Sequence, residues 1–101
     1  MLVIIAHLFM HPGQEVAFRV YETAALARFR AHGGEVLAAF RPSPTADGEP
    51  TPDEIHVLRI ESEEAFALFR GDRARRALDE LRAQAIRETR IFVSQEHIPY
   101  D

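Results

Sequence analysis

The chain of 101 residues contains no cysteine and no lysine. Without thiols, neither a disulfide framework nor a thiolate metal site can form, which is compatible with a cytosolic protein. All twelve basic residues are arginine, sixteen residues are acidic, and the net charge is −4. Nucleic-acid-binding domains are typically basic, so we expect no nucleic acid among the partners.

Several familiar motifs are also missing. The sequence has no phosphate-binding glycine loop, no nucleophile elbow and no zinc-binding helix motif. A nucleotide-dependent enzyme or a serine hydrolase would need such motifs, and we expect no bound cofactor. The apolar run from Leu2 to Met10 is too short to cross a bilayer and has no basic flank. We therefore expect a cytoplasmic protein without a membrane segment.

The composition, 47% hydrophobic and 28% charged, predicts a single globular domain over residues 1–101. Leu2 to Met10 is apolar on both alternating faces, which is typical of a central strand covered on both sides. A helix from about Gln14 to His32 follows, with one stripe formed by Phe18, Tyr21, Ala25, Phe29 and His32. Its opposite side carries small apolar residues, which either contact another element or subunit or simply favour helix formation.

The helical pattern changes to strand alternation at Gly33 and Gly34. We predict a helix end there, with one of the two glycines at positive φ. A second strand covers about Glu35 to Arg41. Residues 42–53 hold four of the six prolines and predict a long, exposed hairpin loop.

A third strand is expected over residues 55–61, with Ile55, Val57 and Arg59 on one face and His56, Leu58 and Ile60 on the other. Ser62 and Asp72 are expected to cap two successive helices, the first ending at Gly71. The second would bury a stripe of Ala74, Ala77, Leu78, Leu81 and Ala85. The last strand is expected over residues 91–95, and residues 97–101 form a tail expected to lie against a neighbour.

Seven arginines lie between Arg70 and Arg90 among several acidic residues. We interpret them as one solvated helix face, with pairs such as Arg75 with Asp79 and Arg76 with Glu80. No aromatic residues alternate with them as in single-strand nucleic-acid binding.

The order of elements, β-α-β-β-α-β, predicts an α+β, ferredoxin-like sandwich. Both helices would cover one face of a four-stranded antiparallel sheet, with the first and third strands innermost. The other face would leave β-branched side chains in water, and burying each contributes roughly 1.5–3 kcal/mol. We therefore expect a homodimer formed through the uncovered sheet face.

Four residues are candidates for a site. His32 is the candidate catalytic base, because imidazole titrates near neutral pH; the alternative is a histidine that caps the helix. Tyr21 could bond a ligand through its hydroxyl or belong to the core. Arg59 could hold a substrate carboxylate or enolate, or pair with an acid of a partner subunit.

His7 is the fourth candidate, as a ligand contact. It also suggests a metal pair with His56 on the neighbouring strand. However, a parallel pairing of these strands would offset the two residues, and no third ligand is evident, so we predict no metal site.

Four segments together resemble one superfamily: "VIIAHLFMHPGQEVAF", "ARFRAHGGEVL", "EIHVLRIESEEAFALFR" and "ALDELRAQAIRET". They are similar to dimeric α+β barrel proteins. Within that superfamily they resemble the domain-of-unknown-function family 1330, which neighbours the antibiotic-biosynthesis-monooxygenase-like proteins. The resemblance implies a homodimer with sheets packed face to face and a small-molecule cleft between sheet and helices. Members of the superfamily include cofactor-free oxygenases, isomerases, haem-degrading enzymes and proteins without known activity.

Two functions are consistent with these observations. The chain either binds or transforms a small, partly aromatic organic compound without metal or cofactor, or it is a structural or regulatory homodimer with a filled pocket. A ligand-sized cavity lined by His32, Tyr21 or Arg59 would favour the first.

Overall fold

The computed structural model describes residues 1–95 and 97–100. Asp101, the last residue of the predicted tail, lies outside the described residues. The elements in chain order are β1 (Leu2–Met10), α1 (Glu15–Ala31), β2 (Glu35–Phe40), β3 (Glu54–Ile60), α2 (Glu63–Arg70), α3 (Arg73–Arg76), α4 (Asp79–Ala85) and β4 (Ile86–Ser94).

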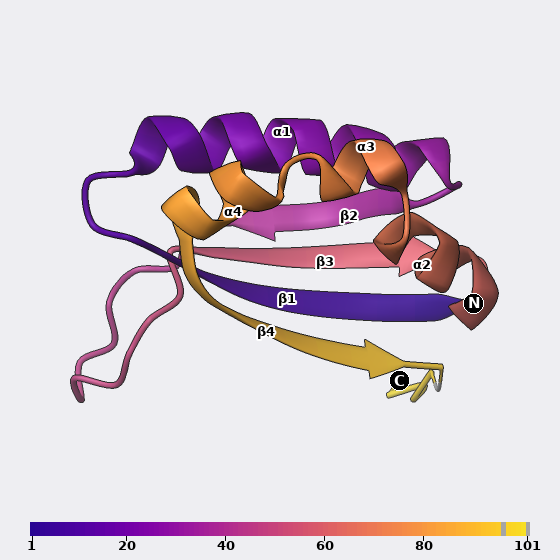
Figure 1. Cartoon of the computed structure of the whole chain (residues 1–101). Coiled ribbons are helices and arrows are strands. Elements are labelled where there is room, and N and C mark those ends of the chain that lie inside the picture. The colour runs from indigo at the N-terminus through magenta and orange to yellow at the C-terminus, as the bar shows by residue number, and fades with distance from the viewer. Residues whose placement is uncertain (96, 101) are drawn as a thin grey trace.

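The four strands form one sheet in the order β2-β3-β1-β4, with every neighbouring pair antiparallel. All helices lie over the same face of this sheet (Figure 1). The ferredoxin-like α+β fold and the inner position of β1 and β3 are thus confirmed. The parallel pairing of these two strands was wrong, because Ala6 faces His56 in an antiparallel register.

The end of α1 is closed by a Schellman motif. The Gly33 amide donates to Arg30 O at 2.9 Å, and the Gly34 amide donates to Phe29 O at 3.0 Å. Gly33 has φ +85°, which confirms the predicted left-handed glycine. The chain therefore leaves the helix directly into β2.

In the second half of the chain, the structure confirms the two predicted helix caps but not the predicted extent of the helices. Ser62 Oγ accepts from the Ala65 amide, and Asp72 Oδ1 accepts from the Arg75 amide. The expected second helix is broken into α3 and α4, so Ala74 and Ala77 of the predicted buried stripe are exposed.

Strand β4 begins five residues earlier than expected, at Ile86. Its polar first half pairs with β1, for example Thr89 with Leu8. The sequence pattern does not show this, because the hydrogen bonds to β1, rather than apolar alternation, define that part of the strand.

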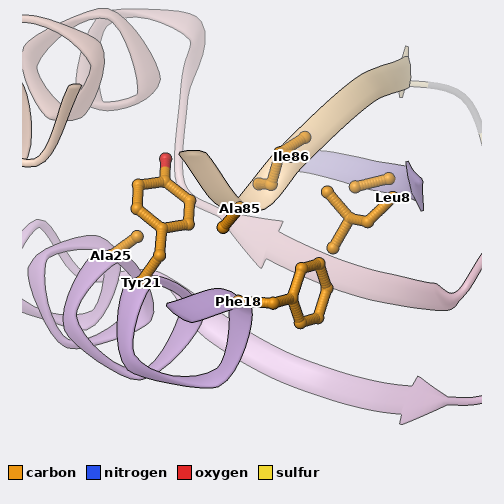
Figure 2. Packing of buried hydrophobic residues seen from close by; sticks show 7 residues of the cluster. Leu8, Phe18, Tyr21, Ala25, Ala85 and Ile86 are labelled. Carbon is orange, nitrogen blue, oxygen red and sulfur yellow. The ribbon is translucent and has the colours of Figure 1, made fainter. Parts of the chain in front are cut away.

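Two buried clusters fill the space between helices and sheet. One contains Leu8, Phe18, Tyr21, Ala85 and Ile86 together with neighbouring alanines, and Figure 2 shows how α1, β1 and the start of β4 contribute to it. The other centres on Phe29, Leu58 and Phe66. The predicted apolar stripe of α1 is buried as far as Phe29.

The opposite face of the sheet carries apolar side chains without a helix over it. Ile5, Phe40 and Phe92 are exposed there, Phe92 by 56%. The outer side of α1 is also apolar and exposed at Val16 and Val20.

Residues 41–53 form an irregular loop that projects beyond one end of the sheet (Figure 1). Its last residue anchors it to β1, because the Asp53 amide donates to Leu8 O and the Asp53 carboxylate accepts from the Met10 amide. Among the described residues, no helix has both the length and the apolar character needed to cross a membrane.

Candidate functional site

A cavity of about 100 Å³ lies between the helical face of the sheet and helices α1 to α4. Most of its wall is apolar and comes from β1, β3 and the inner side of α1. Six polar side chains also line it: Tyr21, Glu22, His56, Arg75, Arg82 and Thr89. Such a mixture of apolar wall and few convergent polar groups is typical of small-molecule sites.

One end of the cavity is aromatic. Phe29 and Phe69 meet edge to face, with ring centroids 5.1 Å apart, and Phe66 stacks on Phe69 at 6.3 Å. All three phenylalanines line the cavity. The void is smaller than the engineered cavity of roughly 150 Å³ that binds benzene, and it is partly open to solvent. An aromatic ligand would therefore lie only partly inside it, with the remainder extending through the open side.

Glu22, His56 and Glu54 form a buried row of ionisable groups. His56 Nε2 lies 2.7 Å from Glu54 Oε1, and His56 Nδ1 lies 3.7 Å from Glu22 Oε2. The side chains are 12% (Glu22), 3% (His56) and 14% (Glu54) exposed. An ionised carboxylate can only accept, so Nε2 carries the proton toward Glu54 and Nδ1 faces Glu22.

The row continues to the surface through Arg41, at the start of the proline-rich loop. Arg41 Nε donates to Glu54 Oε2 at 3.1 Å. Glu54 is therefore held from both sides, by Arg41 and by His56, and in turn it fixes the orientation of the imidazole.

Burial in the apolar cavity and the neighbouring Glu54 carboxylate raise the pKa of Glu22 to about 7, against the opposing effect of the Arg82 guanidinium. A carboxyl group with this pKa can both give and take a proton near neutral pH. The arrangement is therefore suited to acid–base chemistry on a molecule in the cavity.

Cationic groups occupy another part of the wall. Arg82 donates through Nη2 to Thr89 Oγ1 at 3.3 Å, and Arg75 donates through Nη1 to Arg70 O at 2.9 Å. The Arg75 guanidinium also lies 5.0 Å from the centroid of the Phe69 ring. Burial raises the pKa of the Tyr21 phenol, and both guanidinium groups act against that rise.

The interpretation of residues 70–90 as one solvated helix face was therefore wrong. Arg75 and Arg82 line the cavity, whereas Arg87 and Arg90 belong to β4 and lie over the Phe9 ring at 5.4 and 5.5 Å. The ion pair formed on these helices joins Arg76 to Asp79 rather than to Glu80.

Of the residues predicted for the site, Tyr21 lies in the cavity wall. His32 does not line it. Its Nε2 bonds Asp72 Oδ2 at 2.8 Å, and Arg28 binds the same carboxylate. These bonds hold the pKa of Asp72 well below its usual range and tie the end of α1 to the start of α3. The catalytic role of His32 stays a prediction.

Arg59 and His7 lie on the uncovered face of the sheet. Arg59 Nη2 donates to Glu35 Oε1 of its own chain at 2.7 Å, and the His7 ring meets Phe92 edge to face at 5.4 Å. Their predicted ligand roles are likewise untested. His7 and His56 lie on opposite faces of the sheet, and no group of three His, Asp or Glu residues in the described part of the chain is placed to hold a metal ion.

Sequence reasoning missed Glu22, Glu54, Arg75 and Arg82. A signal for Glu22 exists, because the positions 18, 22, 26 and 29 follow helical spacing and all but Glu22 are apolar. A carboxyl group in such a stripe is either at its edge or buried with a partner. Nothing comparable distinguishes Arg82 from the arginines around it.

The antiparallel four-stranded sheet with its helices on one face defines a ferredoxin-like α+β fold. The model of a family described as a domain of unknown function (DUF1330) matches residues 3–95, so the chain belongs to this family. No curated protein matches the chain in sequence.

Solved structures agree on the fold. A protein of unknown function from Rhodopseudomonas palustris superposes with a TM-score of 0.81 at 16% identity, over 97% of this chain and 83% of that one. A NIPSNAP domain protein from Burkholderia xenovorans gives 0.69 at 11% identity, over 96% and 95%. A candidate antibiotic biosynthesis monooxygenase from Nitrosomonas europaea gives 0.70 at 10% identity, over 95% and 98%. At these identities the similarity shows the fold alone.

Proposed function

We propose that the chain binds a small, partly aromatic organic compound in the cavity and transfers a proton to or from it without metal or cofactor. The observation that carries this proposal is the Glu22–His56 pair, buried in an apolar cavity with a carboxyl group whose pKa is near 7. A carboxyl group desolvated in this way costs stability, and such costs are concentrated at functional sites.

Each group has a role in this proposal. Glu22 is the proton acceptor or donor that touches the ligand. His56, with Nδ1 toward Glu22, shares the proton, and Glu54 is a positioning residue that keeps the imidazole in that orientation. General acid–base catalysis of this kind contributes about 10²- to 10⁴-fold, which suits isomerisation of a carbon acid or activation of a phenolic compound toward oxygen.

A panel of four probes tests the proposal: acetophenone, phenol, hydroquinone and benzoate. A probe that binds the folded chain must raise its thermal midpoint. We expect at least one to do so in the native protein and in Ala24→Leu, whose new side chain lies away from the cavity. Ala25→Leu, on the adjacent residue in the cavity wall, should lose the response.

Proton transfer is measured separately. We expect the methyl hydrogens next to the carbonyl of bound acetophenone to exchange in D2O, followed by NMR, with Glu22 as the base that removes the proton, and Glu22→Gln to slow this exchange about 10²- to 10⁴-fold. Failure of all four probes, or an equal response in Ala25→Leu, would overturn the proposal. Circular dichroism of both leucine variants establishes that each is folded.

We further propose that the chain is a homodimer through the uncovered sheet face. The exposed Phe92 and Phe40 and the half-buried Val57 on that face support it, since covering each such side chain contributes about 1.5–3 kcal/mol. The alternative function, a non-catalytic dimer with a filled pocket, is less consistent with the 100 Å³ void.

A further inference from the structure

Two guanidinium groups, those of Arg75 and Arg82, line the cavity. Arg82 has a hydroxyl partner in Thr89, and Arg75 has a backbone carbonyl and an aromatic ring. Within the part of the chain that the structure describes, no carboxylate lies within 4 Å of either guanidinium.

Five other arginines have such a partner. The pairs are Arg28 with Asp72, Arg41 with Glu54, Arg59 with Glu35, Arg76 with Asp79 and Arg90 with Glu88. The chain thus has enough acid to pair its arginines, with sixteen acidic residues against twelve basic ones. Of the seven arginines that have no carboxylate within 4 Å in the described part of the chain, Arg75 and Arg82 are the two that line the cavity.

The acid that lines the cavity, Glu22, does not balance the charge of both guanidinium groups. Its pKa is raised to about 7, so its carboxyl is about half protonated at pH 7 and neutral at lower pH. Two half-buried cations beside this one acid leave the cavity wall with a net positive charge, and charged groups removed from water need a partner of opposite sign.

We infer that the ligand of this cavity is a small organic carboxylate, with its apolar or aromatic body against Phe29, Phe66 and Phe69 and its charged group toward Arg75 and Arg82. This inference rests on the proposed function of the cavity as a ligand site. A guanidinium has five N–H donors in a planar fork that matches both carboxylate oxygens. Arg82 donates to Thr89 and to the Tyr21 hydroxyl, which leaves its other donors for a ligand.

Tyr21 completes the anion site. Its phenol is buried, and its pKa responds to both Arg75 and Arg82, so the hydroxyl lies within the field of both cations and can donate to the same carboxylate.

The test compares ligands that differ only in charge. Benzoate and benzamide have nearly the same shape, as do the smaller butyrate and butyramide. Dissociation constants are measured by NMR titration of the full chain at pH 7. We expect each carboxylate to bind at least about 10-fold more tightly than its amide, because hydrogen bonds between ionised partners are roughly twice as strong as neutral ones.

Variants identify the groups responsible. Arg82→Gln should weaken benzoate binding about 10- to 100-fold, as expected for the loss of a charged hydrogen-bond partner, while leaving benzamide unchanged. Arg75→Gln is a second variant that acts from a different helix. Arg73→Gln, an exposed arginine two residues before Arg75, is the matched control and should change neither ligand.

The outcomes separate the two proposals. Equal affinity for amides and carboxylates, or unchanged benzoate binding in both Arg82→Gln and Arg75→Gln, would overturn the anion site and leave the proposed function standing. Binding of none of the four ligands and of no probe in the earlier panel would overturn the proposed function and this inference together.

Discussion

Glu22 is a carboxyl group inside an apolar helix stripe, and its environment has a consequence for stability. Its pKa is raised from an ordinary value near 4.5 to about 7 in the folded chain, mainly by burial. The folded state therefore binds more protons than the unfolded state between these pH values. The contribution of Glu22 to the free energy of unfolding is therefore most favourable below pH 4.5 and is lost as the pH rises through 7.

We expect this term to remove up to about 3 kcal/mol of the free energy of unfolding between pH 4.5 and 7.5, at 1.36 kcal/mol per pKa unit. In Glu22→Gln the loss over this range should be much smaller. Urea denaturation at a series of pH values measures it. Glu54, His56 and Arg82 also face this carboxyl and can change the stability with pH. The effect of Glu22 is therefore measured as the difference in free energy of unfolding between the native protein and Glu22→Gln at each pH. Parallel stability curves would contradict the raised pKa.

The buried His56 illustrates how far residue-level prediction extends. Strand alternation placed it correctly on the same face as Leu58 and Ile60. Its partners could not be predicted, because Glu22 comes from a helix 34 positions earlier and reaches it only when α1 packs on the sheet. Arg82 enters the cavity because the chain breaks between α3 and α4, and no local signal for that break is evident.

At the scale of elements, the end of α1 uses its two glycines for different reasons. Gly33 has φ +85° with open space around its Cα, whereas a Cβ on Gly34 would overlap the Phe29 ring. Gly33→Ala should therefore cost about 1 kcal/mol from the left-handed backbone. Gly34→Ala should cost about 1–3 kcal/mol from overpacking against Phe29.

Urea denaturation of both variants checks these values. Gly71→Ala is the control, because Gly71 also ends a helix but has negative φ, and its added Cβ would make only ordinary contacts. It should be neutral or slightly stabilising. A Gly33→Ala protein as stable as Gly71→Ala would contradict the Schellman end.

Elements with a strong local signal were predicted well, and those defined by pairing were not. The helix end at Gly33, the caps at Ser62 and Asp72 and the two-faced strand β1 follow from local chemistry. The first half of β4 has the polar sequence Arg87-Glu88-Thr89-Arg90 and becomes a strand because β1 offers it an unpaired edge.

At the scale of the whole molecule, the proposed dimer gives a direct prediction. Phe92→Asp places a charge on the uncovered sheet face, and Val20→Asp places one on the outer side of α1 at a nearly equal exposure, 54% against 56%. Light scattering at micromolar concentration should show a dimer for the native chain and for Val20→Asp, and a monomer for Phe92→Asp. Val57→Asp, nearer the centre of the face, should dissociate or unfold the protein. A monomeric native chain would contradict the proposal.

The pairing of β1 with β4 joins the two ends of the chain, since Val3 lies opposite Ser94, and both ends lie away from the projecting loop (Figure 1). Linking the ends and opening the chain between Asp47 and Gly48 would turn this most distant contact into a local hairpin. Folding rates rise as the mean sequence separation of contacts falls, because less chain entropy is lost before those contacts form. The circular permutant should therefore refold faster than the native order in stopped-flow experiments. The opening between Asp47 and Gly48 also cuts the connection between β2 and β3. A slower permutant would therefore mean that this connection, not the pairing of β1 with β4, limits folding.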